Sequence, residues 1–104
     1  MSSLAHDLSS LAAVGVEVTE ESVIADLSDG RTIAVPLEWY PRLIAASREE
    51  RNNWRLIGDG EGIRWPDVDE DISIAHLIAG NKSTESQSSL QKWLSTRSGE
   101  AKSK

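Results

Sequence analysis

Four acidic residues stand within five positions, directly after a Trp-Pro step. Carboxylates can bind divalent cations, and paired carboxylates with shifted pKa values can act as general acids and bases. We call this segment the acidic stretch, and its side chains form a candidate ligand site or, alternatively, a structural turn: Trp65, Asp67, Asp69, Glu70 and Asp71. The acidic stretch is therefore the first candidate for a ligand-binding or catalytic site in this chain.

A calcium site would need more than the alternate acids Asp67, Asp69 and Asp71, whose spacing resembles the start of an EF-hand loop. That loop requires glycine at its sixth position and glutamate at its twelfth. This chain has Ile72 and Ile78 at those positions. We therefore expect no metal site and no cofactor.

Other catalytic groups are scarce. His6 and His76 are the two histidines and stand far apart, and the chain has no cysteine. Seven of the 15 serines lie after residue 80, and none of the 15 stands in a G-x-S-x-G nucleophile elbow. The glycine-rich segment 58–62 matches no phosphate-binding motif, and Asp59 and Glu61 within it would repel phosphate. The sequence thus predicts a protein that is not an enzyme.

The composition limits the class of protein. A chain of 104 residues is sized for one small domain. No apolar run approaches the roughly 18 residues of a membrane-spanning helix, and the first residues lack the features of a secretory signal. The net charge of −6 argues against direct nucleic-acid binding, which needs clustered lysine and arginine. These features predict a cytoplasmic protein whose partner is another protein or a second copy of itself.

Alternating apolar residues predict the sheet that must position the acidic stretch. Strands are expected at residues 14–18, 23–27, 31–35, 54–57 and 63–65. Asp29-Gly30 predicts a hairpin, and a three-residue loop from Ser28 to Gly30 puts the apolar side chains of both strands on one face. The expected fold class is α+β, with a small antiparallel sheet of about five short strands packed with two to four short helices.

Two short helices are expected between the third and fourth strands. Pro41 is tolerated in the first turn of a helix, so we expect a tight turn over 37–40 and then a helix. Ile44 should be among the side chains of this helix that face the sheet. Ser47 and Glu50 have the spacing of a capping box, which predicts the second helix.

The acidic stretch should lead directly into another helix. Ser73 can cap a helix over 74–79, and Gly80 can end it. Acids just before a helix start are favoured by the helix dipole, which gives them a structural role without a ligand. The indole N–H of Trp65 should be held by a nearby carboxylate or carbonyl group.

The two ends of the chain differ from the middle. Residues 1–13 are predicted to form an amphipathic helix that Gly15 can end, residues 14–80 the α+β domain, and residues 81–104 a polar flexible tail with room for a short helix at 89–96. The apolar residues of both ends are the candidate partner contacts: Leu4, Leu8, Leu11, Leu90, Trp93 and Leu94.

A set of motifs over residues 14–80 resembles the bacterial domain-of-unknown-function family 2442. The motifs are Asp29-Gly30, Pro36-Leu37, Tyr40-Pro41-Arg42-Leu43, Ala46, Arg51-x-x-Trp54, Gly60-x-Gly62-Ile63-x-Trp65-Pro66-x-x-Asp69-Glu70-Asp71-Ile72-Ser73 and Leu77-Ile78-x-Gly80. The resemblance implies a small α+β domain, which in some relatives precedes a helix-turn-helix domain and in others stands alone. It also implies an antitoxin-like role, by association, and it carries over no catalytic residues.

Residues 81–104 are too few and too polar for a helix-turn-helix, which argues again against direct DNA binding. The function we expect is a non-enzymatic protein-interaction module, antitoxin-like if the resemblance holds. The alternative is a regulatory or sensor domain that self-associates and binds a small ligand at the acidic stretch.

Overall fold

The computed structural model describes the backbone of residues 11–102 and the side chains of residues 11–97. Within that range the strands are β1 Ala13–Val18, β2 Ser22–Leu27, β3 Thr32–Pro36, β4 Arg55–Ile57, β5 Gly62–Trp65 and β6 Glu70–Ser73. The helices are η1 Leu37–Trp39, α2 Pro41–Ala45, α3 Arg48–Asn52, η2 Gly58–Gly60, α4 Ile74–Ala79 and α5 Gln87–Lys102, of which η1 and η2 are 3-10 turns. The predicted α+β class is confirmed.

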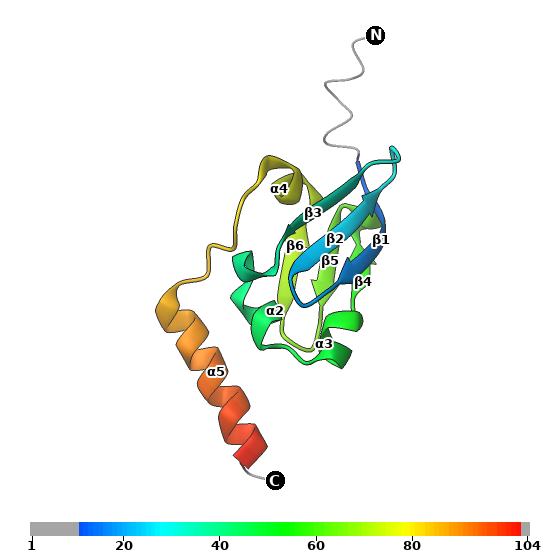
Figure 1. Ribbon diagram of the computed structural model, residues 1–104. Helices are drawn as coiled ribbons and strands as arrows, with labels where there is room; N and C mark the ends of the chain where they lie inside the picture. The colour runs from blue at the N-terminus through cyan, green and yellow to red at the C-terminus, as the bar shows by residue number, and fades with distance from the viewer. Residues whose placement is uncertain (1–10, 103–104) are drawn as a thin grey trace.

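The strands form two antiparallel sheets of three strands each, in the orders β1-β2-β3 and β4-β5-β6. Figure 1 shows the first sheet lying across the second, with α2 and α3 at one end of the sheets and α4 near the other. The helix α5 lies outside this body and runs down one side of the molecule (Figure 1). The acidic stretch connects β5 to β6, inside the second sheet.

The hairpin between β2 and β3 has the predicted register. The amide of Leu27 donates to the carbonyl oxygen of Arg31 at 2.8 Å, which closes a three-residue loop. Ala25 then lies opposite Ile33. Gly30 has φ +96°, a left-handed conformation that favours glycine. The choice of register from the buried face is therefore confirmed.

The strand β6 is a correction to the sequence prediction. Glu70 and Ile72 pair with Trp65 and Ile63 of β5, where we expected a turn leading into a helix. The acids and Ser73 match the residue types that favour a helix start. In the structure, however, successive side chains alternate between the two faces of a strand, and Glu70 and Ile72 lie on the inner face. The described part of the chain consequently has a sixth strand and two sheets, rather than one sheet of about five strands.

Local signals at the helix ends are mostly confirmed. Ser47 and Glu50 form the capping box of α3, and Pro41 is at the start of α2. Gly80 ends α4 with φ +80°. The cap at Ser73 is wrong, because its hydroxyl makes no capping hydrogen bond. The amide at the start of α4 instead donates to a backbone carbonyl in the loop between β4 and β5, at 2.9 Å.

Both sheets contribute to one apolar core. Its most buried members are Val23, Ala25, Leu27, Leu43, Ile63, Trp65, Val68, Ile72 and Ile74. The indole N–H of Trp65 donates to the carbonyl oxygen of Arg51 at 2.9 Å, which confirms the predicted carbonyl partner. Ile44 is wrong as a core residue, since it is 47 % exposed. A single helical turn has room for one inward side chain, and Leu43 takes that place.

The ends of the described chain differ from the prediction in length. β1 begins at Ala13, and Leu11 and Ala12 before it are not helical. Gly15 lies in β1, beside a bulge, and therefore ends no helix. Leu4 and Leu8, with most of the helix predicted for residues 1–13, lie outside the described residues. At the other end, α5 is longer than the segment 89–96.

Candidate functional site

The structure separates the acids of the acidic stretch. Asp67 accepts a hydrogen bond from an asparagine amide at 2.9 Å. Asp69 and Asp71 both accept from the guanidinium group of Arg64, at 3.0 and 2.8 Å, and both are exposed. Glu70 faces the other way, because side chains alternate along β6. The acids thus do not converge on one ligand, and Glu70 is the member that enters the interior.

Glu70 is half-buried beside other charged groups. Burial raises the pKa of Glu70 to about 7, and the negative charge of Glu85 acts in the same direction, while Arg42 opposes both. Burial also raises the pKa of Tyr40, with a further contribution from the charge of Glu70. Glu70 therefore changes its charge near neutral pH.

A pocket of about 260 Å³ lies beside Glu70, between β6, α4 and the polar segment that follows α4. The hydroxyl of Tyr40 donates to the backbone carbonyl of Asn81 at 3.2 Å and so links the core to that segment. The polar side chains that line the pocket include Glu70, Ser73, His76, Asn81 and Ser83. They offer a carboxyl group, hydroxyl groups and an imidazole to a small polar ligand.

Arg42 joins the acidic stretch to the C-terminal segment 81–102, which we call the arm. Its Nε and Nη2 atoms donate to the carboxylate of Glu85 at 2.9 and 2.7 Å. Its Nη1 atom donates to the backbone carbonyl of Val68 at 3.1 Å and lies 4.0 Å from Asp69. The hydrogen bonds between the two side chains raise the pKa of Arg42 and lower that of Glu85. Together with the hydrogen bond from Tyr40 to Asn81, this pair, little exposed to solvent, forms the first part of the contact between arm and domain.

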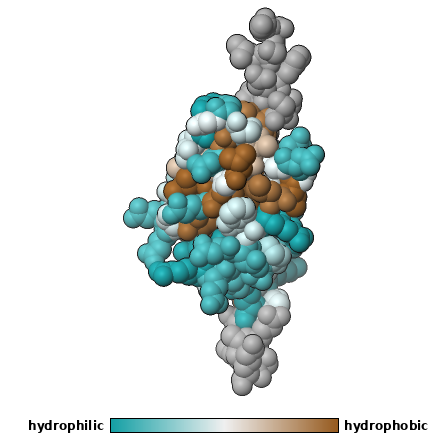
Figure 2. Space-filling view, turned by 90° about the vertical axis from the view of Figure 1, so that its right-hand side faces the viewer, coloured by the Kyte–Doolittle hydropathy of each residue, from teal (hydrophilic) through white to brown (hydrophobic). Residues whose placement is uncertain are grey.

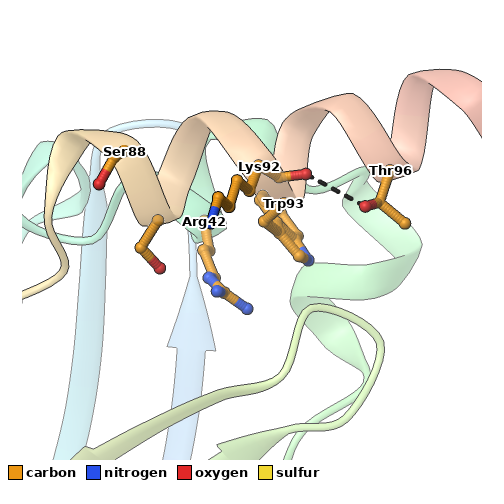
Figure 3. A pocket seen from close by; sticks show the side chains of 6 residues that line it. Arg42, Ser88, Lys92, Trp93 and Thr96 are labelled. Carbon is orange, nitrogen blue, oxygen red and sulfur yellow. Dashed lines mark hydrogen bonds between the residues drawn. The ribbon is translucent and has the colours of Figure 1, made fainter.

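Trp93 is the second point of contact. Its ring centroid lies 4.7 Å from the guanidinium carbon of Arg42 and 4.8 Å from that of Arg97. Arg97 also donates to the carboxylate of Glu50 at 2.8 Å. Figure 3 shows Arg42 and Trp93 together at a pocket of about 430 Å³ beneath α5, with Lys92 on the helix above them. Cation–π contacts and ion pairs thus hold the arm against α2 and α3.

The predicted partner contacts have different environments. Trp93, Leu90 and Leu94 lie on α5, and all three are half-buried. Leu11 is 6 % exposed and lies at the start of the domain. Leu4 and Leu8 are outside the residues that the structure describes. The arm therefore carries the contact candidates that can be placed in space.

Sequence reasoning did not identify Arg42 as a site residue. The signal was present, because Arg42 stands inside the motif Tyr40-Pro41-Arg42-Leu43. Its partner Glu85, however, is 43 positions away, in a segment without periodicity. A pairing of this kind depends on the tertiary fold.

Residues 11–97, whose side chains the structure describes, contain no group of three or more His, Cys, Asp or Glu side chains placed to hold a metal ion. No helix within residues 11–102 has the length and apolar character to cross a bilayer.

The fold and the site define a small α+β domain that carries a helical arm. Residues 13–83 match the model of a family described as proteins of unknown function, DUF2442, and the chain belongs to this family. It is also similar to a protein of unknown function from Rhodospirillum rubrum ATCC 11170, whose crystal structure has a TM-score of 0.62. The two are 30 % identical over 72 % of this chain and 93 % of the other. No curated protein matches the chain.

Proposed function

We propose that this chain is a non-enzymatic protein-interaction module and that the arm makes the contact. The observation that carries the proposal is the position of Trp93, which is half-buried on a helix beyond the family match and lies beside Arg42 and Arg97. Tryptophan and arginine are the residue types that most often dominate the binding energy of protein interfaces. A partner surface would complete the burial of this indole.

Leu90 and Leu94 support the same assignment. They stand three residues before and one residue after Trp93, so the three side chains form one stripe on α5. The domain covers part of this stripe and leaves the rest to solvent. A helix that presents such a stripe can lie in an apolar groove of a partner.

The experiment compares partner capture from the native host by variants of the full chain. Leu90→Ser with Leu94→Ser removes the stripe, whereas Gln91→Ala with Ser95→Ala changes two exposed residues of the same helix. The proposal predicts a protein that is retained by the wild type and by the control variant and lost with the serine variant. A protein retained by all three chains would show that the contact lies outside the stripe on the arm. If none of the three retained a protein, the proposed interaction module would be contradicted.

The antitoxin-like role implied by the family resemblance is part of this proposal, with a bacterial cytoplasmic setting. The partner is then a small toxin, and the absence of cysteine fits a reducing compartment. Co-expression with the product of a neighbouring gene should restore growth that this product alone inhibits. The leucine-to-serine double variant should not restore it, and equal rescue by both chains would contradict the role of the arm.

A second candidate function is a regulatory or sensor domain that self-associates and binds a small ligand. The observation that favours it is the half-buried Glu70, which lines a pocket. A ligand that binds the folded state raises the melting temperature by mass action. Small polar compounds and divalent cations should therefore give a shift that Glu70→Gln removes, and a flat screen would contradict the sensor function.

A further inference from the structure

Within the described residues, one edge of the strand β1 is free. It pairs with β2 on one side, and no strand within residues 11–102 pairs with its other side. The amide of Thr19 donates to the carbonyl oxygen of Ser22 at 2.9 Å, so this pair and every second pair along the ladder are hydrogen-bonded. The N–H and C=O groups of Val16 and Val18 consequently point away from β2. They are placed to pair with another strand.

The two faces beside this edge differ in chemistry. Val16 and Val18 place their side chains on the inner face of the sheet, and Glu17 lies on the outer face. Asp26 lies on the outer face opposite Gly15, where a Cβ atom at Gly15 would be 3.4 Å from its Oδ2 atom. Because Gly15 has no side chain, the carboxylate of Asp26, which accepts a hydrogen bond from the Thr32 hydroxyl at 2.8 Å, remains exposed on the side of β1. One side of the edge is thus apolar and the other acidic.

Apolar side chains lie around the edge, and α3 borders one end of it, where Arg48 and Arg51 line a pocket with Glu17 and Val18. Figure 2 looks onto the side of β1 and β4 and shows apolar side chains gathered across the middle of this face. Val14, at the bulge of β1, is 65 % exposed. Proteins commonly guard an edge strand with lysine or proline, and β1 contains neither.

We propose that the free edge of β1 binds an extended segment of a partner protein that carries basic side chains at alternate positions. The backbone of that segment pairs with Val16 and Val18. Its lysine or arginine side chains lie on the outer face, against Glu17 and Asp26, and its other side chains extend the row of valines. This surface is separate from the arm, so the inference does not depend on what the arm contacts.

Charge excludes a second copy of this chain as the preferred occupant. If Val16 pairs with Val16 of another copy, Glu17 of each chain lies opposite Gly15 of the other and beside Asp26. If Val16 pairs with Val18, the two Glu17 side chains lie opposite each other. Like charges at directly opposite positions destabilise a strand pair. Basic side chains at the same positions form ion pairs instead.

The test uses a short blocked peptide of alternating valine and lysine, with a peptide of alternating valine and glutamate as its charge-reversed control. Each peptide is titrated into the full chain and followed by amide NMR. The lysine peptide should shift the amide signals of Val16 and Val18 and slow their hydrogen exchange, and the glutamate peptide should leave them unchanged. Equal responses to both peptides, or no response of β1 to the lysine peptide, would overturn the proposal.

Substitutions at the two edges of the same sheet sharpen the test. Val16→Pro removes an outward N–H group of β1 and leaves the bonds to β2 in place. Ala34→Pro is the matched control, because the register of β2 and β3 points its N–H group out of the opposite edge. Val16→Pro should weaken binding of the lysine peptide about tenfold, and Ala34→Pro should not change it.

Glu17→Lys keeps the proposal testable if Val16→Pro fails to fold. The substitution reverses a charge on the outer face and leaves the backbone unchanged. It should weaken the binding of the lysine peptide and strengthen the binding of the glutamate peptide. Unchanged binding of the lysine peptide by this variant would contradict the charge pairing on which the choice of partner rests.

Discussion

Trp65 and Trp93 are held in different ways. Trp65 is 0 % exposed, and its indole N–H donates to the carbonyl oxygen of Arg51. Trp93 is half-buried, with its ring beside the guanidinium groups of Arg42 and Arg97. Close packing fixes the first, whereas polar contacts that water can replace hold much of the second. The buried core of the domain therefore determines the fold, and we expect the arm to open without unfolding the domain.

The largest effect should come from removing the buried tryptophan. Trp65→Ala leaves a cavity and an unpaired carbonyl group, and should lower the free energy of unfolding by about 3–5 kcal/mol. Trp93→Ala should cost about 1 kcal/mol, because the ring already contacts solvent. Urea denaturation measures both. Equal losses would remove the distinction between domain and arm.

A smaller effect is expected from Arg42→Lys. Lysine keeps the charge but loses the forked hydrogen bonds to Glu85 and the planar contact with Trp93, so the arm should loosen at a cost of about 1–2 kcal/mol. The NMR signal of the Trp93 indole N–H should move toward its solvent-exposed position. Arg64→Lys is the control, since it alters an exposed ion-pair cluster and should leave that signal in place. An unmoved signal in Arg42→Lys would show that other contacts hold the arm.

Glu70, which lies near the contact between arm and domain, should make the free energy of unfolding depend on pH. Its folded pKa of about 7 lies above the ordinary value of 4.5, so the folded state retains a proton that the unfolded state releases. The free energy of unfolding should therefore fall as the pH rises from about 5 to about 7. Glu70→Gln should flatten this slope and stabilise the protein at pH 8 by about 1–2 kcal/mol, allowing for solvent screening.

Denaturation at a series of pH values between 5 and 8 checks this prediction. Glu85 acts in a different window, because its lowered pKa gives stability that is lost under more acidic conditions. A slope that is the same in wild type and Glu70→Gln would contradict the burial of this carboxyl group.

The smallest effect should come from Asp71→Ala. Asp71 accepts from Arg64 at the surface and caps no helix, and Asp69 still pairs with Arg64 in the variant. The loss should be about 0.5 kcal/mol or less, as for other exposed ion pairs. Thermal melting measures it. A loss comparable with that of Arg42→Lys would give the exposed acids a larger structural role than their contacts indicate.

The sequence predicted the features that depend on neighbouring residues better than those that depend on residues far apart in the chain. The loop at Gly30, the capping box at Ser47 and the helix start at Pro41 depend on neighbouring residues, and all three are confirmed. β6 was missed because four residues are too few to distinguish a strand from the start of a helix.

The candidate site depends on contacts over longer distances. The sequence identified Glu70 as a candidate site residue. Its burial could not be predicted, because it follows from the pairing of Glu70 with Trp65 across the sheet. Arg42 lies in one region of the sequence and its partners Glu85 and Trp93 in another. Local sequence patterns do not predict contacts between residues so far apart in the chain. The contact between arm and domain could therefore be identified only from the three-dimensional structure.

The separate opening of the arm is tested most directly by native-state hydrogen exchange of the backbone amides. We expect the amides of α5 to exchange through an opening of smaller free energy than those of β5. Arg42→Lys should accelerate exchange in α5 and leave exchange in β5 nearly unchanged. Equal protection of α5 and β5 would contradict the account, because arm and domain would then unfold as one cooperative unit.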